Sequence, residues 1–357
     1  MPVFTEIEKK GHECVLYGSD LPSKLKCIIA IHDVSLGPAL GGTRLWPYKS
    51  DEEALVDVLR LSRGMTYKAA CAGLNLGGGK AVIIASPEQK TEAMFRAFGR
   101  FVERLGGAYI TAEDVNTSVE DMRWVRKETK YVTGLPREDG GSGDPSPVTA
   151  YGVFYGMRAA LEEALGSADF RGRTVAIQGL GKVGYALCGH LADAGAVLYV
   201  ADIEPKRVEK AVKEFKARKV DPEEIFSVEA DVFSPNALGG IITSKVVERM
   251  RFKIIAGGAN NQLEDDDVQG AMLKSKAVLY APDYVLNAGG LINVHGELEE
   301  GGYNEEKAYQ RAAGIYDRMK ELFRIAAEED IPTTEAAKVM ARRRLSKKKE
   351  TSHGSGS

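Results

Sequence analysis

The chain has 357 residues, enough for two domains of ordinary size, with 44% hydrophobic residues, 28% charged residues and a formal net charge of −3. This balance is typical of a soluble globular protein and does not favour nucleic acid or an anionic membrane as a partner. No apolar run approaches the roughly 18 residues that span a bilayer. The N-terminus lacks the basic and apolar regions of a signal peptide, so we expect a cytoplasmic protein.

Cysteine and histidine spacing argues against a metal site. The five histidines form neither an H-x3-H nor an HExxH pattern, so we expect no bound metal. The four cysteines are far apart and show no CxxC spacing, which indicates reduced, mostly buried thiols rather than a disulfide framework or a zinc site. These cysteines are Cys14, Cys27, Cys71 and Cys188.

The first part of the chain alternates short apolar runs with helical periodicity. Such alternation predicts an α/β domain, which we place at residues 1–140. A capping box at Ser50–Glu53 opens one of the helices. The predicted elements are strands at 26–32, 81–84 and 108–111, and helices at 50–61 and 91–105.

A loop rich in Gly, Pro, Ser and Asp at 135–147 predicts a hinge between two domains. The next helix is expected from about Val148 to Leu165, and a second α/β domain covers 148–330. Helical patterns return at 306–323 and 335–345, and we expect the closing helices at 331–346 to pack back on the first domain. The polar residues 347–357 predict a disordered tail.

Two lysines stand beside glycines, at Gly64–Lys68 and in the run Gly77–Lys80. Glycines without side chains allow flexible backbone and close approach of another group. A lysine in a tight, poorly hydrated site has a lowered pKa and can act as a base near neutral pH. Taken alone, each lysine could equally be a solvated surface charge.

A dinucleotide-binding signature lies about a hundred residues further on. The apolar run 174–178 predicts a strand, and Gly179-Leu180-Gly181-Lys182-Val183-Gly184 follows it and opens a helix. Gly179 allows the tight turn, Gly181 lets a pyrophosphate reach the helix N-terminus, and Gly184 lets helix and strand pack closely. The alternative is a packing turn that binds no ligand.

Asp202 ends the next predicted strand, 18 residues after the last glycine of the signature. A carboxylate there accepts hydrogen bonds from both hydroxyls of an adenosine ribose and repels a 2′-phosphate, so NAD is preferred over NADP. Lys206 and Arg207 lie nearby in sequence and soften this preference.

Six motifs, in order, resemble those of the amino-acid dehydrogenases that act on glutamate, leucine, valine, phenylalanine and tryptophan. The resemblance runs from about Lys26 to about Leu345. It implies an N-terminal substrate and oligomerisation domain, a doubly wound Rossmann domain, a cleft between them, and a homo-oligomer from dimer to octamer. The motifs are PALGGTR at 38–44, GMTYK at 64–68, GGGK at 77–80, TAEDV at 111–115, GANNQL at 258–263 and APDYVLNAGG at 281–290.

The reaction implied by the resemblance is oxidative deamination of an L-amino acid by NAD and water to a 2-oxo acid and ammonia. In this reading Lys68 holds the substrate carboxylate, Lys80 is the general base that activates water, and Asp114 relays protons to and from the amine nitrogen. The resemblance assigns the amino-acid head group to Gly41, Gly42 and Asn261, and it places Thr149 and Asn287 at the cofactor.

The side chain of the substrate is predicted to be apolar. Glutamate dehydrogenases have a lysine that pairs with the side-chain carboxylate of the substrate, and this chain has Leu40 at the matching position. A leucine would leave that buried carboxylate unpaired. By resemblance the pocket comprises Leu40, Ala112, Leu291 and Val294. Ala112 resembles the residue that leucine dehydrogenases have at this position, whereas Leu291 resembles the residue of the phenylalanine and tryptophan dehydrogenases. We favour branched-chain substrates, with a phenylalanine or tryptophan dehydrogenase as the alternative.

Two other classes explain fewer of the residues. A 2-hydroxy-acid dehydrogenase needs a histidine base beside a carboxylate, and His12, His32, His190 and His295 have no supporting motif. A nucleotide-binding regulator with a dead site predicts the loss of Lys80 or Asp114, yet both are present.

Overall fold

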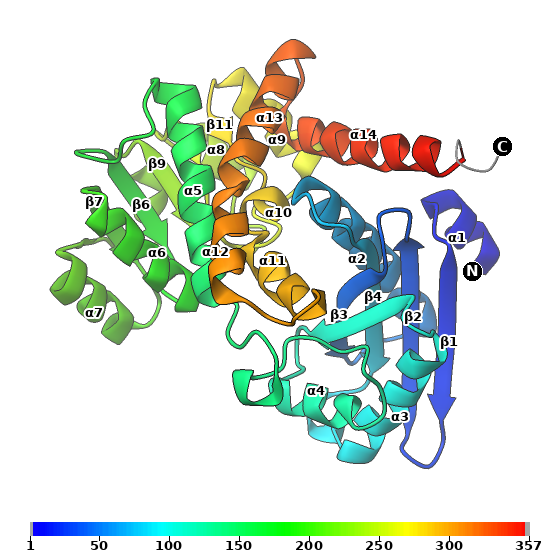
Figure 1. Ribbon diagram of the computed structural model, residues 1–357. Helices are drawn as coiled ribbons and strands as arrows, with labels where there is room; N and C mark the ends of the chain where they lie inside the picture. Colours follow the sequence, from blue (N-terminus) through cyan, green and yellow to red (C-terminus); the bar gives the residue numbers. More distant parts are fainter. Residues whose placement is uncertain (1–2, 354–357) are drawn as a thin grey trace. The chain divides into compact units, whose positions relative to one another are not determined.

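The computed structural model describes residues 3–353 as two compact units (Figure 1). The first contains the described residues 3–144, 294–303 and 341–353. The second contains 145–293 and 304–340. The boundary between Asp144 and Pro145 falls inside the loop predicted as a hinge.

The first unit is built on a five-stranded mixed sheet in the order β1-β2-β4-β3-β5. β1 pairs antiparallel with β2, and β2 with β4, whereas β3 lies parallel to both β4 and β5. Its elements are α1 Val3–Lys10, β1 Cys14–Asp20, β2 Leu25–Asp33, β3 Ala39–Trp46, α2 Asp51–Cys71, β4 Gly77–Ile84, α3 Glu92–Arg104, β5 Tyr109–Glu113 and α4 Val119–Arg126.

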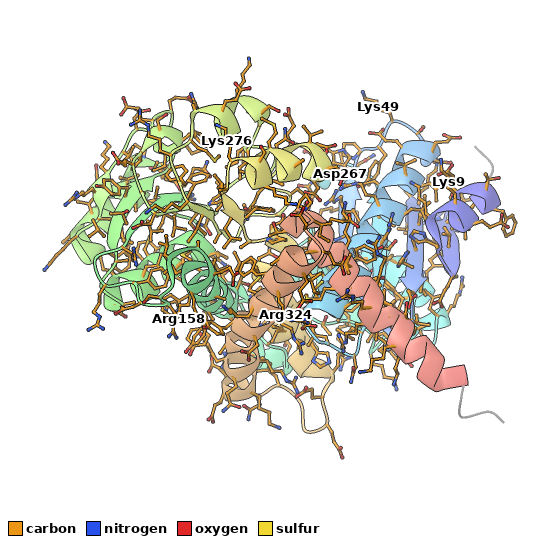
Figure 2. All side chains as sticks on the ribbon, turned by 90° about the horizontal axis from the view of Figure 1, so that it is seen from above. Lys9, Lys49, Arg158, Asp267, Lys276 and Arg324 are labelled. Atoms are coloured by element: carbon orange, nitrogen blue, oxygen red, sulfur yellow. The ribbon has the colours of Figure 1, made fainter. Side chains whose placement is uncertain are left out.

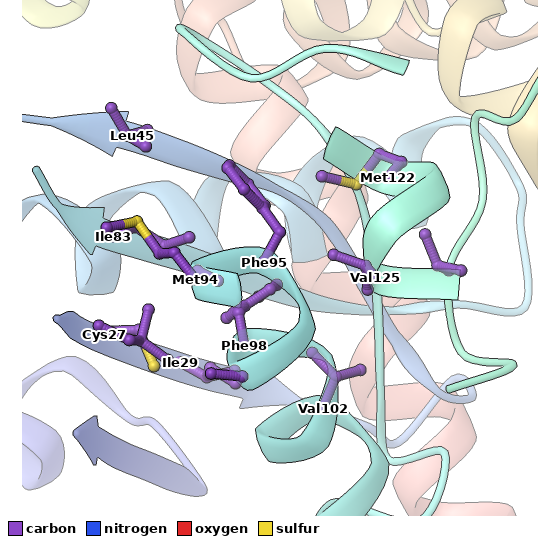
Figure 3. Packing of buried hydrophobic residues seen from close by; sticks show 14 of the residues in the cluster. Cys27, Ile29, Leu45, Ile83, Met94, Phe95, Phe98, Val102, Met122 and Val125 are labelled. Carbon is purple, nitrogen blue, oxygen red and sulfur yellow. The ribbon is translucent and has the colours of Figure 1, made fainter. Parts of the chain in front are cut away.

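The two faces of this sheet pack against different helices, as strand alternation requires. Ile28, Ala30 and Val82 cluster with apolar residues of α2. Their neighbours along the same strands, Ile29 and Ile83, point the other way, toward α3 and α4 (Figure 3). The predicted helix at 91–105 is confirmed as α3, since Thr91 is its N-cap and accepts a hydrogen bond from the backbone N–H of Met94.

Both glycine-flanked lysines lie in regular structure rather than in flexible turns. The segment Gly64–Lys68 lies inside α2, which continues to Cys71 instead of ending near Leu61. The run Gly77–Lys80 begins β4 and is fully buried. The prediction of flexible backbone at these two motifs is therefore wrong.

The second unit is a six-stranded parallel sheet in the order β11-β10-β9-β6-β7-β8. In chain order this is the 3-2-1-4-5-6 arrangement of a doubly wound dinucleotide-binding fold, so the predicted fold class is confirmed. The strands are β6 Thr174–Gln178, β7 Val197–Ala201, β8 Arg218–Lys219, β9 Val232–Pro235, β10 Ile254–Ile255 and β11 Leu279–Tyr280.

Helices account for most of the remaining second unit, and charged residues such as Asp267, Lys276 and Arg324 are exposed on its surface (Figure 2). The helix predicted from Val148 is observed as α5. The helices are α5 Ser146–Leu165, α6 Lys182–Asp193, α7 Pro205–Phe215, α8 Ser244–Arg249, α9 Asp266–Ser275, α10 Asp283–Leu286, α11 Gly289–His295, α12 Glu305–Ala313 and α13 Ile315–Glu328.

The C-terminal part differs from the sequence-based expectation in two respects. The helical pattern predicted at 306–323 is two helices, α12 and α13, separated at Gly314. The last helix, α14, spans Thr333–His353, so residues 347–353 are helical where a disordered tail was predicted. Its residues up to Met340 belong to the second unit. The end of the predicted tail, 354–357, lies outside the described residues.

Candidate active site

A buried lysine–aspartate pair forms the centre of the candidate site in the first unit. Lys80 lies on β4 and is only 5% exposed, and its Nζ is 3.0 Å from Oδ1 of Asp114. Asp114 directly follows β5. The structure therefore brings together two residues that are 34 positions apart and that spacing alone could not connect.

Both members of the pair have pKa values below their ordinary range. Burial is the largest influence on Lys80 and lowers its pKa, while the carboxylate of Asp114 opposes this effect. For Asp114, burial favours the neutral acid, but the charges of Lys80 and Arg44 outweigh it and lower the pKa of the carboxyl. The site thus holds an ionised aspartate against a lysine that gives up its proton more readily than a solvated one.

Arg44 completes the arrangement and was not singled out by sequence reasoning. Its Nε donates to Oδ2 of Asp114 at 3.0 Å, and its Nη1 donates to Oδ2 of Asp57 on α2, also at 3.0 Å. Arg44 belonged to one of the six motifs, PALGGTR, but its partners are 13 and 70 residues away in sequence. No local pattern indicates such contacts.

A turn after β5 fixes the backbone of Asp114. Its N–H donates to Oγ1 of Thr117, and that hydroxyl donates to the carbonyl of Thr43 on β3. A Cβ atom placed at Gly42 would lie 2.9 Å from Cβ of Asp114 and 2.4 Å from the carbonyl oxygen of Glu113. Glycine at 42 is therefore needed for the segment that carries Asp114 to lie against β3.

The glycines before Lys80 make room for protein groups rather than for a ligand. A Cβ at Gly77 would meet the carbonyl oxygen of Asp33 at 2.2 Å, one at Gly78 would meet the backbone nitrogen of Thr66 at 2.1 Å, and one at Gly79 would meet the ring of Tyr109 at 2.6 Å. The glycine run is thus required for α2, β2 and β5 to pack closely against β4.

Lys68 is half-buried in the last turn of α2. This turn is held by Arg344 of α14, whose Nη1 donates to the carbonyls of Ala69 and Ala70 at 3.2 and 3.0 Å. A cation at the C-terminus of a helix satisfies carbonyls that have no partner within the helix. The C-terminal helix therefore supports the backbone that carries Lys68.

The predicted substrate-pocket residues are divided between the units. Leu40 is buried on β3, where it pairs with Gly78 of β4, and Gly42 pairs with Ala112 of β5. Gly41 accepts a 2.6 Å hydrogen bond from the buried hydroxyl of Tyr109. The other two residues lie on α11: Leu291 belongs to the second unit, and Val294 to the segment assigned to the first.

The glycine-rich loop of the second unit lies between β6 and α6, at the point where the strand order reverses. Gly179 has a φ of +93°, and a Cβ at Gly184 would lie 2.1 Å from the carbonyl oxygen of Gly179. Gly181 is the N-cap of α6 without a side-chain cap, and a Cβ there meets nothing within 4 Å. The open helix N-terminus with Leu180, Lys182 and Val183 fits a dinucleotide pyrophosphate.

Asp202 follows β7 and lies beside this loop. Its Oδ2 accepts a 2.6 Å hydrogen bond from the backbone N–H of Leu180, and Nη1 of Arg207 lies 3.7 Å from the same oxygen. The carboxylate is thus oriented by the loop that the sequence assigned to the cofactor.

The remaining predicted residues also lie in the second unit. The hydroxyl of Thr149, on the first turn of α5, donates to the carbonyl of Pro145. Asn287 follows α10 and donates from Nδ2 to the carbonyl of Gly258 and to Oδ1 of Asn260. Asn261 is exposed and has a left-handed backbone with a φ of +50°.

The part of the chain that the structure describes has neither a metal-binding cluster nor a membrane-spanning helix. There, His, Cys, Asp and Glu side chains form no group of three or more suited to holding a metal ion. Within the same residues no helix is both long and apolar enough to cross a membrane. The four cysteines are free thiols, three of them buried.

Comparison with known proteins identifies related sequences over nearly the whole chain. Residues 19–131 match the family model described as Glu/Leu/Phe/Val dehydrogenase, dimerisation domain. Residues 140–204 and 198–353 match Glutamate/Leucine/Phenylalanine/Valine dehydrogenase.

The similar proteins include enzymes that are named for different amino acids. The chain is 54% identical to a leucine dehydrogenase of Geobacillus stearothermophilus over 97% of this chain and 94% of that protein. It is 49% identical to an L-tryptophan dehydrogenase of Nostoc punctiforme over 98% of both chains. The crystal structure of L-tryptophan dehydrogenase from Nostoc punctiforme superposes with a TM-score of 0.89 at 47% identity, covering 97% of this chain and 99% of that one.

Proposed function

The chain belongs to the Glu/Leu/Phe/Val dehydrogenase family, and we propose that it oxidatively deaminates leucine, valine or isoleucine with NAD as the hydride acceptor. The observation that carries this proposal is the buried ion pair between Lys80 and Asp114. A lysine with a lowered pKa beside an ionised carboxylate suits a reaction that must move several protons at one carbon.

The overall reaction converts R–CH(NH3⁺)–COO⁻, NAD⁺ and water to R–CO–COO⁻, NH4⁺, NADH and H⁺. When bound, the nicotinamide supplies the acceptor for the hydride that leaves the α-carbon. All proton transfers fall to the protein. Lys80 takes a proton from the water that attacks the substrate iminium carbon, and Asp114 exchanges protons with the substrate nitrogen.

The substrate carboxylate needs a fixed cation, and we assign this role to Lys68, with Gly41, Gly42 and Asn261 at the head group. The last turn of α2 suits the anchor because Arg344 holds its carbonyls. An ammonium on a supported helix turn keeps the α-carbon at a constant distance from the base.

NAD is proposed as the cofactor because Asp202 directly follows β7 and lies next to the glycine loop. Thr149 and Asn287 would complete the cofactor site together with Gly179–Gly184. Replacing Asp202 by Ala should weaken NAD binding and reduce the discrimination against NADP. Unchanged Kd values for both nucleotides, measured by calorimetry, would contradict this role.

The substrate side chain would contact Leu40, Ala112, Leu291 and Val294, and leucine is favoured over aromatic residues. Leu40 is buried and cannot compensate a side-chain carboxylate, so glutamate should not be a substrate.

We further propose a homo-oligomer formed through the first unit, in agreement with the family description of that region. Free thiols and a nicotinamide cofactor agree with a cytoplasmic enzyme.

The proposal is tested by following NADH formation with a panel of L-amino acids, each with NAD and with NADP. We expect the highest kcat/KM with leucine, valine or isoleucine and NAD. A maximum with phenylalanine or tryptophan would support the aromatic alternative. Turnover with glutamate, or with a 2-hydroxy acid and no amino acid, would refute the assignment.

A further inference from the structure

Arg44 joins the catalytic pair to a second carboxylate on the neighbouring helix. The two oxygens of Asp114 are each held by a different cation, Oδ1 by Lys80 and Oδ2 by Arg44. Arg44 in turn contacts Asp57 through a separate nitrogen of its guanidinium group. Because the guanidinium group is planar and rigid, these two contacts fix its orientation.

Asp57 is itself held from two sides. Its Oδ2 accepts a 2.7 Å hydrogen bond from the hydroxyl of Tyr48, and its Oδ1 accepts one of 2.8 Å from Nη2 of Arg60. A hollow of about 750 Å³ lies beside this end of the network and is lined in part by Arg44, Tyr48 and Asp57. The network therefore runs from the buried Lys80 to solvent.

Charges alternate along this network: Lys80 positive, Asp114 negative, Arg44 positive, Asp57 negative. Arg44 favours the ionised form of Asp114 and the neutral form of Lys80, whereas Asp57 favours the charged form of Lys80. The side chains of Arg44, Asp57 and Asp114 are all less than one quarter exposed, so solvent screens these interactions only partly.

We propose that Arg44 and Asp57 are positioning residues for the deamination: Arg44 holds the Asp114 carboxylate against Lys80, and Asp57 holds Arg44. This inference rests on the proposed function, because it assigns the two residues an effect on that reaction. The elements around the pair carry further ionisable groups: Arg44 on β3, Tyr48 after it, Asp57, Arg60 and Lys68 on α2, and Tyr109 on β5. Of these, Arg44 and Asp57 shift the pKa of Lys80, in opposite directions.

Two substitutions with opposite charge effects separate this role from a general structural one. Arg44→Met removes a positive charge and should raise the pKa of Lys80, whereas Asp57→Asn removes a negative charge and should lower it. Deamination needs neutral Lys80, so kcat falls on the acid side of its pH profile. This acid limb should shift to higher pH in Arg44→Met and to lower pH in Asp57→Asn, each by about half a pH unit or more. Arg44→Met should also lower kcat about 10-fold or more with a smaller change in KM.

Arg100→Met is the matched control. Arg100 is an exposed residue of α3, the helix that packs on the face of the sheet opposite to α2, and it also lies between two carboxylates, 3.8 Å from Asp20 and 3.8 Å from Glu128. Its removal should leave the pH profile unchanged. Arg44→Lys keeps the charge and should return the acid limb toward the wild-type position, while restoring kcat only in part because an ammonium lacks the planar fork.

Wild-type turnover of leucine with NAD is measured first, because its absence would refute the proposed function and not the geometry. Crystal structures of the variants then test the positioning role without turnover. In Arg44→Met the Oδ2 atom of Asp114 loses its partner, so the carboxylate should turn while it stays paired with Lys80; in Arg100→Met it should keep its orientation and its 3.0 Å contact. An unchanged orientation of the Asp114 carboxylate in Arg44→Met, or acid limbs that move in the same direction in Arg44→Met and Asp57→Asn, would overturn the proposal.

Discussion

Gly78 is the position where the packing argument for the glycine run can be tested most sharply. A Cβ atom there would lie 2.1 Å from both the backbone nitrogen and Oγ1 of Thr66, and 2.5 Å from the carbonyl oxygen of Ser62. Ordinary contacts begin at 3.4 Å, so β4 and α2 would have to separate by about 1.3 Å.

The obstructing atoms include backbone of α2, which cannot rotate away as the end of a side chain can. Overpacking of this kind costs typically 1–3 kcal/mol, and we expect Gly78→Ala to lose about 3 kcal/mol or more. The displaced Thr66 hydroxyl also makes a 2.8 Å hydrogen bond with Nδ1 of His32, which adds to the loss. Activity should fall as well, because Lys80 follows two residues later on the same strand.

Gly64 supplies a control on the same helix. It is exposed inside α2, and a Cβ there meets nothing within 4 Å. Gly64→Ala should therefore stabilise the protein by about 1 kcal/mol, the difference in helix propensity.

Urea unfolding followed by tryptophan fluorescence suits this comparison, since both tryptophans of the chain, Trp46 and Trp124, lie in the first unit. The reasoning is refuted if Gly78→Ala unfolds at the same urea concentration as the wild type.

Two further predictions concern the same unit. Burial lowers the pKa of His12 and of His32 from 6.5 to about 4, so the unfolded chain binds protons below pH 6.5 that the folded chain excludes. Stability should be constant above that pH and fall between pH 6.5 and 4, by up to about 3 kcal/mol for each histidine, in urea titrations at a series of pH values. His32→Gln should weaken this pH dependence, and an unaltered slope would contradict the assignment. Arg344→Ala should cost about 1–2 kcal/mol and raise KM for the amino acid, because it frees the helix turn that carries Lys68. If Arg344→Ala is less stable but has an unchanged KM, Arg344 supports the fold and not the binding of the substrate.

Local chemistry explains which parts of the fold could be predicted. Thr91 caps α3 as expected because an N-cap depends only on the residues next to it. The dinucleotide loop could also be predicted from the sequence, because its strand, its glycines, its helix and Asp202 all fall within about thirty residues.

The parts that escaped prediction depend on contacts between distant segments. The glycines at 77–79 resemble a flexible turn in sequence, but their requirement comes from Thr66, Asp33 and Tyr109 on other elements. The juxtaposition of Lys80 and Asp114 was likewise indicated by family resemblance and not by spacing.

The central claim is that Lys80 acts as the base of an NAD-dependent deamination, and the most direct test compares Lys80→Ala with Lys49→Ala. Lys49 is an exposed lysine of the same unit whose side chain projects into solvent (Figure 2). We predict that Lys80→Ala stays folded and binds NAD but loses almost all leucine-dependent NADH formation, while Lys49→Ala retains it. Full turnover in Lys80→Ala would contradict the claim.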